Sequence, residues 1–154
     1  MTEIPATWLE SDILKKFTTV YKNSVKILTF SDMSEKTFDQ EICVDGLLIS
    51  TNKNDELVNI ELMLPMSKWR RCEHIQLPKY KTRGRVFLPN IDQIPPENIS
   101  SFETLYDKTC GTLQIILDSV HTVEKVVQFS NNAVASFSSD LLLSIYIFDK
   151  VLLQ

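Results

Sequence analysis

The N-terminal segment has the polar and apolar spacing of an amphipathic helix. Thr7 and Glu10 stand at the spacing of a capping box, in which a hydroxyl and a carboxylate satisfy the first backbone N–H groups. Leu9, Ile13 and Phe17 then follow at the period of a helix with one buried face. Acidic residues come first and lysines later, in the order that stabilises a helix dipole. The pattern predicts a helix over about residues 8–22.

Farther along the chain, apolar residues follow a period of two or form short unbroken runs, as in β-strands. Asp45-Gly46 is a turn signal between two such runs. A second, short helix is predicted after Pro95 and Pro96, with Gly111 as its C-terminal cap. Strands are expected over residues 25–30, 38–44, 47–51, 57–62, 112–117, 123–129, 133–137 and 141–148, with a helix as the alternative for residues 123–129.

These elements predict an α+β fold, with about seven or eight strands in a mainly antiparallel sheet or two, an N-terminal helix and a short central helix. We expect one domain over residues 1–154, because no segment is suited to be a long linker. Residues 44–60 and 129–145 share one order: a turn, a short strand, a polar turn with Asp and a longer apolar strand. Both a duplicated β-meander and the general similarity of hairpins explain this pattern.

The composition is that of a folded globular protein, with 44% apolar and 23% charged residues, which excludes global disorder. The chain has 3 Gly and 3 Cys, too few for a Gly-rich phosphate-binding fold or a disulfide scaffold. No apolar run is long enough to span a membrane, and no secretory signal is evident. We therefore expect a cytoplasmic protein with reduced and mostly buried thiols.

The net charge of −4 is unevenly distributed along the chain. Residues 1–65 carry 11 acidic residues and 6 lysines, and residues 86–154 carry 8 acidic residues and 3 lysines. All the arginines lie in the intervening segment, which is strongly basic. Lysine and arginine can also protect an edge strand from unwanted pairing, so this segment does not by itself identify a partner.

No motif for catalysis or metal binding is present. Cys72, Glu73 and His74 are too close together in sequence for a closed metal site, and we expect no metal or cofactor. Asp118 and His121 could form an acid–base pair, although a turn in which the aspartate caps its own backbone is the simpler interpretation. Without a nucleophile elbow or a phosphate-binding loop, the chain is expected not to be an enzyme.

A small, acidic chain without motifs, whose charges gather in patches, resembles as a class the immunity proteins of bacterial toxin–immunity systems, such as contact-dependent growth inhibition. This resemblance implies a non-enzymatic protein that neutralises a cognate toxin by blocking its active site in a one-to-one complex. An acidic surface suits a cationic nuclease domain, because it covers the nucleic-acid groove and speeds association. The candidate contacts are Asp32, Glu35, Asp39 and Glu41 for a basic partner, and Arg70, Arg71, Lys79, Lys81, Arg83 and Arg85 for an acidic one.

The alternative function is a nucleic-acid-binding module that uses the basic segment, residues 68–85. Side chains two apart on a strand lie about 6.5–7 Å apart, close to the spacing of phosphates along one strand. Trp69 and Tyr80 could stack on bases. The rest of the chain is acidic and would repel a long polyanion, so nucleic acid is the less favoured partner.

Overall fold

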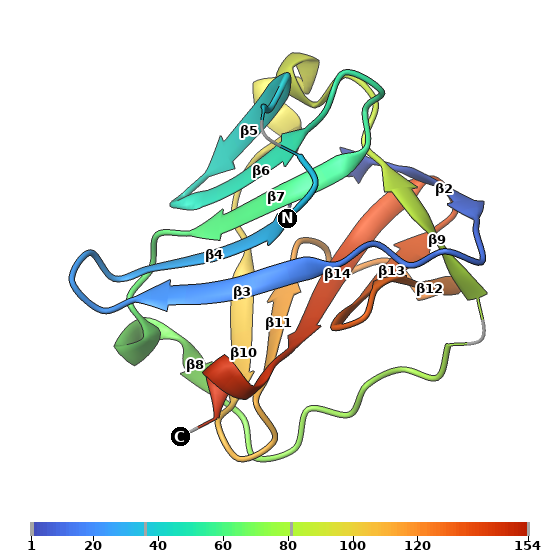
Figure 1. The fold of residues 1–154 in the computed structure, drawn as a ribbon. Helices are drawn as coiled ribbons and strands as arrows, with labels where there is room; N and C mark the ends of the chain where they lie inside the picture. Colours follow the sequence, from blue (N-terminus) through green and yellow to red (C-terminus); the bar gives the residue numbers. More distant parts are fainter. Residues whose placement is uncertain (1, 36, 81, 154) are drawn as a thin grey trace.

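The computed structural model describes residues 2–35, 37–80 and 82–153. Two β-sheets, of nine and five strands, face each other across one hydrophobic core (Figure 1). The five-stranded sheet has the order β3 (Phe17–Lys22), β4 (Ile27–Asp32), β7 (Leu57–Leu62), β6 (Leu47–Thr51), β5 (Gln40–Val44). The nine-stranded sheet has the order β2 (Thr7–Glu10), β9 (Thr82–Phe87), β12 (Lys125–Ser130), β13 (Ala133–Ser138), β14 (Leu141–Phe148), β11 (Thr112–Ile116), β10 (Glu103–Asp107), β8 (Arg70–Arg71), with β1 (Ile4–Pro5) paired to β14.

The predicted α+β class is wrong, because the described chain is mainly β. Its helical elements are 3₁₀ turns of three residues each: η1 (Met66–Lys68), η2 (Ile91–Gln93), η3 (Pro96–Asn98) and η4 (Lys150–Leu152). No helix in the described ranges has the length and hydropathy required to cross a bilayer.

The predicted N-terminal helix is replaced by β2 and β3, which lie in different sheets. Leu9 and Ile13, which established the helical spacing, are 63% and 80% exposed and contribute little to the core. In β3, Phe17 and Thr19 are buried while Thr18 and Val20 are exposed, so the true period is two. Thr19 and Val20 are β-branched and suit a strand paired with β4.

The predicted central helix is also wrong. Pro96 begins only the turn η3; Ile99 and Phe102 lie in the irregular stretch after it, and Leu105 and Tyr106 belong to β10. Gly111 does adopt a positive φ of 67°, but in the turn between β10 and β11 rather than at a helix end. The turn predicted at Asp45-Gly46 is confirmed, with φ of 45° and 89°.

The two sheets contain the same arrangement of five strands. In the five-stranded sheet, the hairpin β3–β4 is followed by the meander β5–β6–β7, and β7 pairs with β4. In the nine-stranded sheet, the hairpin β10–β11 is followed by the meander β12–β13–β14, and β14 pairs with β11. We call these units repeat 1 (residues 17–62) and repeat 2 (residues 103–148).

The strand registers of the two repeats also agree. Tyr21 of β3 pairs with Leu28 of β4. Tyr106 of β10 pairs with Leu113 of β11, so each number is 85 higher in repeat 2 (106 against 21, 113 against 28). The pairings of β4 with β7 and of β11 with β14 keep the same shift. The similarity found in two hairpins therefore extends to both five-strand units.

Both meanders have a register irregularity at the equivalent place. Just before it, Asn59 Nδ2 donates a hydrogen bond to Ser50 Oγ at 3.3 Å in repeat 1. The hydroxyls of Ser136 and Ser144 form the corresponding contact at 2.8 Å in repeat 2. Bulges are specific features that recur within related structures. The shared topology, register and irregularity favour a duplicated unit over chance similarity of hairpins.

The tyrosines at equivalent positions meet at one tryptophan. The rings of Tyr21 and Tyr106 pack edge-on against Trp69, with centroids 5.9 and 5.2 Å away. Each hydroxyl also binds the 3₁₀ turn after its own repeat: Tyr21 accepts from the N–H of Met66, and Tyr106 donates to the carbonyl of Leu152. Trp69 therefore ties both repeats together in the interior.

The segment before each repeat crosses to the other repeat. β1, before repeat 1, pairs through Pro5 with Leu141 at the start of β14. The N–H of Ala6 then donates to the carbonyl of Asp140 at 2.8 Å. The two repeats are thus connected by an exchanged strand as well as by the core.

The second crossing has the same geometry. Phe87, at the end of β9 and before repeat 2, bridges to Glu56 at the start of β7. The N–H of Leu88 donates to the carbonyl of Asp55 at 2.8 Å. Glu56 and Asp55 are the repeat 1 counterparts of the residues that receive β1, so the exchange is reciprocal.

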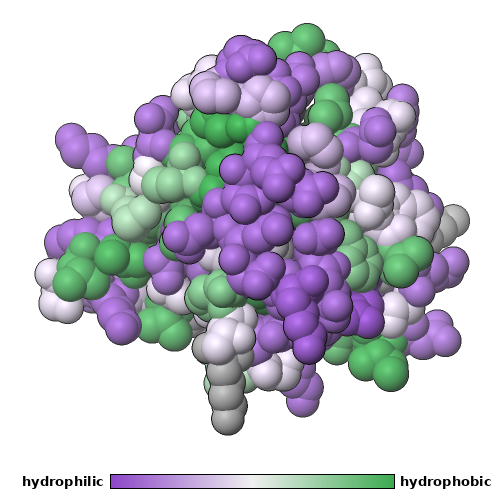
Figure 2. All heavy atoms as spheres, turned by 90° about the horizontal axis from the view of Figure 1, so that it is seen from above, coloured by the Kyte–Doolittle hydropathy of each residue, from purple (hydrophilic) through white to green (hydrophobic). Residues whose placement is uncertain are grey.

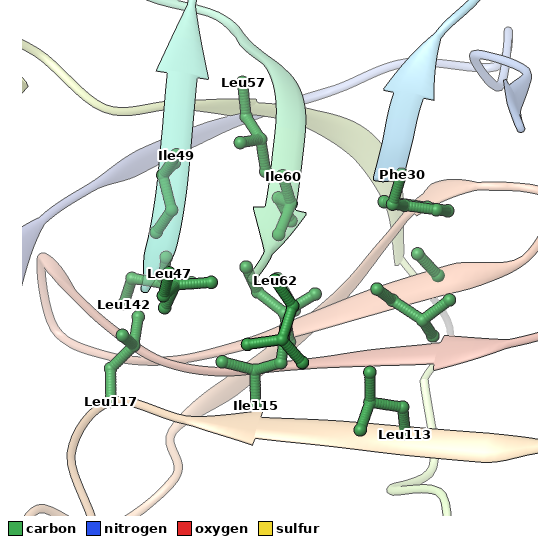
Figure 3. Close-up of a cluster of buried hydrophobic side chains, with 14 of the residues drawn as sticks. Phe30, Leu47, Ile49, Leu57, Ile60, Leu62, Leu113, Ile115, Leu117 and Leu142 are labelled. Atoms are coloured by element: carbon green, nitrogen blue, oxygen red, sulfur yellow. The ribbon is translucent and has the colours of Figure 1, made fainter. Parts of the chain in front are cut away.

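The inner faces of the sheets supply the core. Figure 3 shows side chains of β4, β6 and β7, such as Phe30 and Leu62, pointing toward Leu113 and Ile115 of β11. All four are essentially inaccessible to solvent. Close packing of this kind makes the sandwich sensitive to changes of volume.

Gly84 is required where β2 crosses closely over β9. A Cβ atom at this position would lie 2.5 Å from the carbonyl oxygen of Leu9 and 3.1 Å from a methyl carbon of Val127. Because the nearest atom is backbone, β2 would have to move. We expect Gly84→Ala to lower the free energy of unfolding by about 1–3 kcal/mol in urea titrations. Thr82→Ala on the same strand is the control, and equal midpoints for Gly84→Ala and wild type would contradict this packing.

Candidate partner-binding surface

An acidic edge follows β5, the last strand of the five-stranded sheet. Asp39, Glu41 and Asp45 are exposed, and residues 37–52 contain no lysine or arginine. We call these three residues the acidic edge. Figure 2, seen from the side of β5, shows mainly hydrophilic surface across the middle of this face. The negative charge of the acidic edge is complementary to a cationic partner.

The directions in which the backbone N–H and C=O groups of β5 point follow from the turn that joins β5 to β6. Asp45-Gly46 makes a two-residue hairpin loop, so Val44 and Leu47 form a hydrogen-bonded pair. Hydrogen-bonded pairs alternate along antiparallel strands, so the N–H and C=O groups of Glu41 and Cys43 point away from β6. Within the described ranges, no loop or turn forms a backbone hydrogen bond to either residue. The turn η2 lies beside β5 without such a bond.

Two of the four acids predicted to contact a basic partner lie on this edge, and two do not. Glu41 is exposed on β5, and Asp39 is exposed immediately before it. Glu35 accepts a hydrogen bond from Asn52 Nδ2 at 2.9 Å and so braces the neighbouring turn. Asp32 is only 3% exposed, which makes it unsuitable as a direct contact.

Asp32 belongs instead to an ion-pair network in which both carboxylates are buried and both cations are partly exposed. Lys15 Nζ lies 3.2 Å from Asp32 Oδ2 and 3.4 Å from Glu56 Oε1. Arg85 Nε and Nη2 donate to the Glu56 carboxylate at 2.7 and 2.5 Å. Nothing in the sequence marks this network, because its members come from four separate segments.

The network holds its cations firmly in the charged form. Burial alone would lower the pKa of Lys15, but its hydrogen bond to Asp32 and the charges of Asp32 and Glu56 raise it above its ordinary value. The pKa of Arg85 is also raised, mainly by the hydrogen bonds to Glu56. Arg85 therefore neutralises the buried Glu56 carboxylate, while its own side chain remains 41% exposed.

The structure divides the basic segment. Arg70 and Arg71 lie on β8, whereas Arg83 and Arg85 lie on β9, near the opposite end of the strand order. Arg70 faces Glu103 at 3.5 Å, and the Arg71 guanidinium lies over the Tyr106 ring at 5.5 Å. The described arginines of this segment therefore do not form one continuous cationic stripe.

Two further members of the basic segment lie between those strands. Lys79 is exposed on the irregular stretch that leads from β8 to β9. Lys81, predicted as a contact, lies outside the described residues. Trp69, proposed to stack on bases, is 2% exposed and is occupied by the core tyrosines.

Asp118 and His121 do meet, within one turn. His121 Nδ1 lies 2.8 Å from Asp118 Oδ2, while Asp118 Oδ1 accepts from the backbone N–H groups of Val120 and His121. Burial would raise the pKa of Asp118, but the hydrogen bonds from the His121 backbone, its imidazole and the Val120 N–H outweigh it and lower this pKa. The carboxylate thus acts as the cap of its own turn.

The lowered pKa makes Asp118 a source of acid sensitivity. Its contribution to stability is complete above the pKa of the unfolded chain, about 3.9, and is lost as pH falls through the lower pKa of the folded protein. As pH falls from about 5 to about 2.5, the free energy of unfolding should decrease less in Asp118→Asn than in wild type, as measured by urea titrations. Asp140→Asn is the control, and identical pH slopes for wild type and Asp118→Asn would contradict this assignment.

Chemically reactive groups gather in one hollow near the β10–β11 turn. It has a volume of about 580 Å³, and Cys72, His74, Asp107 and Cys110 are among its lining residues. The Asp107 carboxylate is engaged by backbone N–H groups of the adjoining loops. Its hydrogen bond and charge raise the pKa of the Cys110 thiol, which makes this thiol a weaker nucleophile. The described ranges contain no group of three or more side chains placed to hold a metal ion.

The cysteines differ from expectation in their burial. All are free, but Cys43 and Cys110 are exposed and Cys72 is partly exposed, so the prediction of mostly buried thiols is wrong. Comparison with models of known protein families gave no match, and no curated protein matches the chain.

Proposed function

We propose that this protein is a non-enzymatic binding protein that uses its acidic edge to cover the functional surface of a basic partner protein. An immunity protein that neutralises a cationic toxin, such as a nuclease domain, is the specific case we propose. The supporting observation is the acidic edge of β5, where Asp39, Glu41 and Asp45 are exposed without an intervening cation. Charge complementarity of this kind speeds encounter and selects the partner.

Other features support binding over catalysis and over nucleic-acid recognition. The Asp118–His121 contact serves a turn, and Asp107 is engaged by backbone groups. The separation of Arg70 and Arg71 from Arg83 removes the continuous stripe that a nucleic-acid strand would follow. Three free cysteines, two of them exposed, suit the reducing conditions of the cytoplasm, which we propose as the location.

Capture of the partner tests this function. We would immobilise wild-type protein, the variant Asp39→Lys/Glu41→Lys and the control Glu10→Lys/Asp12→Lys, and expose each to lysate of the native host. The control changes the same charge at exposed positions with the same spacing on and just after β2. A protein retained by wild type and control but not by the β5 variant is then purified and titrated.

The expected result is a one-to-one complex, measured by size exclusion with light scattering, whose formation abolishes the partner's toxicity or enzymatic activity. A mobility-shift assay with mixed tRNA at low and high salt accompanies it. Strong, salt-sensitive binding of tRNA without any protein partner would overturn the proposal. Equal loss of partner by both double variants would also overturn it, since net charge rather than the acidic edge would then control binding.

A further inference from the structure

The equivalent edge strands of the two repeats have different neighbours. In repeat 2, β12 receives β9 as a parallel neighbour, with Val127 beside Thr82 and Gln128 beside Arg83. In repeat 1, β5 is the counterpart of β12 but ends its sheet. The fold therefore contains two copies of the same strand edge: one pairs with β9, and the other has turn η2 beside it but no strand paired to it.

The counterparts agree in local hydrogen bonding. The N–H of Asp39 donates to the carbonyl of Thr51 before β5, and the N–H of Glu124 donates to the carbonyl of Phe137 before β12, both at 2.8 Å. The four residue pairs that follow keep the same register, from Gln40–Thr51 to Cys43–Leu48 and from Lys125–Phe137 to Gln128–Val134. After them, β12 has a register irregularity between Gln128 and Ser130 that β5 lacks. Val126 and Gln128 correspond to Glu41 and Cys43. The backbone groups of β5 that point away from β6 are thus the counterparts of those beside β9.

Charge indicates which kind of strand the open edge would accept. β9, the occupant of the equivalent edge, carries Arg83 and Arg85 and follows Lys79. β5 presents Asp39 and Glu41 to solvent at alternate positions. Cationic side chains at alternate positions of an added strand would lie close to these carboxylates. An added strand with acidic side chains at these positions would be repelled.

We propose that β5 accepts an extended basic segment of the partner protein as an added parallel strand, in the position that β9 takes on β12. This inference rests on the proposed function and specifies how the partner binds. The N–H and C=O groups of Glu41 and Cys43 supply the backbone bonds. Asp39, Glu41 and Asp45 select a basic sequence. This is strand addition to a sheet edge, in which backbone bonds give affinity and alternate side chains give specificity.

A peptide copy of the internal occupant is the probe. We would use an acetylated and amidated peptide with the sequence of residues 79–88 of this chain, which includes β9. Its binding to the full-length protein is measured by fluorescence anisotropy and by amide hydrogen exchange in NMR spectra. A second peptide of the same sequence, with alternate backbone nitrogens methylated, cannot form the ladder of an added strand.

We expect the unmodified peptide to slow exchange at Glu41 and Cys43 by about tenfold or more, with no change at Val126 and Gln128, whose backbone groups already face β9. Asp39→Lys/Glu41→Lys should weaken binding about tenfold, whereas Glu10→Lys/Asp12→Lys should not. Equal binding of the methylated peptide would overturn the proposal. So would no binding of the unmodified peptide, or binding without protection at Glu41 and Cys43.

The same exchange measurement on the captured partner complex separates this inference from the proposed function. A one-to-one complex without protection at Glu41 and Cys43 would refute strand addition and leave the binding function intact. Failure to capture any partner would refute the binding function itself, whatever the peptide does.

Discussion

Replacing Lys15 with methionine is expected to lower the free energy of unfolding by about 3–5 kcal/mol at neutral pH. Lys15 is the cation shared by Asp32 and Glu56, whose side chains are each 2% exposed. Methionine keeps the length of the side chain but removes its charge, so Asp32 loses its ion-pair partner in the interior. Urea unfolding followed by circular dichroism measures the loss.

The pH dependence identifies the cause. In the Lys15→Met protein a buried, unpaired carboxylate should have a raised pKa, so the deficit relative to wild type should shrink as pH falls toward about 5. Lys16→Met is the control, because Lys16 is exposed. An equal loss in both variants, or a deficit independent of pH, would contradict the network's role.

Repeat 2 suggests how the loss could be recovered. The shift of 85 places Leu117 and Leu141 as the counterparts of Asp32 and Glu56, so apolar side chains occupy the equivalent positions in repeat 2. Adding Asp32→Leu and Glu56→Leu to Lys15→Met should restore most of the stability, because well-packed apolar residues often replace buried ion pairs without loss. Arg85 loses its partner Glu56 in this variant, but its side chain is already 41% exposed and can turn to solvent. No recovery in the triple variant would show that these positions are not equivalent in their packing.

Replacing Trp69 with alanine is expected to cost about 3–5 kcal/mol, the range for a large buried aromatic residue. The indole fills the space between Tyr21 and Tyr106, and its Nε1 donates to the carbonyl of Leu64 at 2.9 Å. Urea unfolding of Trp69→Ala and wild type, followed by circular dichroism, measures the difference. Trp8→Ala is the matched control and should cost less, because Trp8 is only partly buried.

The exchanged strands add a second expectation to this experiment. Because β1 pairs with repeat 2 and the end of β9 bridges to repeat 1, the two repeats should unfold together in wild type and in Trp69→Ala. Circular dichroism and tyrosine fluorescence should therefore give coincident transitions. Two separated transitions in wild type would show that the repeats are independent, and would contradict the interlocked arrangement.

Local sequence signals predict strands and turns correctly where strands that pair with each other are also adjacent in the sequence. Asp45-Gly46 favours a tight turn with positive φ, which brings the runs on either side of it together as a hairpin. The hairpin within residues 133–148 was predictable for the same reason. These strands are confirmed, and their similarity in sequence to residues 44–60 already indicated the repeat.

The failures occurred where long-range pairing decides the structure. Residues 8–22 satisfy a helical period, but β2 depends on β9, a segment far away in the sequence. Tertiary pairing of this kind overrides local propensity. Pro95 and Pro96 likewise open only a turn, because the residues after η3 pair with β11 and not with one another.

The candidate surface was predictable only in part, for a related reason. Acidic residues at alternate positions of a strand mark a solvated face, which located Asp39 and Glu41. Asp32 has the same character in sequence, and only its contact with Lys15 reveals that it is buried. Arg83 and Arg85 have the same character in sequence, and only the contact of Arg85 with the buried Glu56 distinguishes them.

The footprint of the partner on this protein is the most direct test of a binding function centred on β5. We would measure hydrogen exchange of wild-type protein with and without the captured partner at equal concentrations. Slower exchange over residues 39–45, with β8 and the Asp118–His121 turn unchanged, is the expected result. Protection confined to β8, to that turn or to the hollow lined by Cys72 and Cys110 near the β10–β11 turn would contradict a binding function centred on β5.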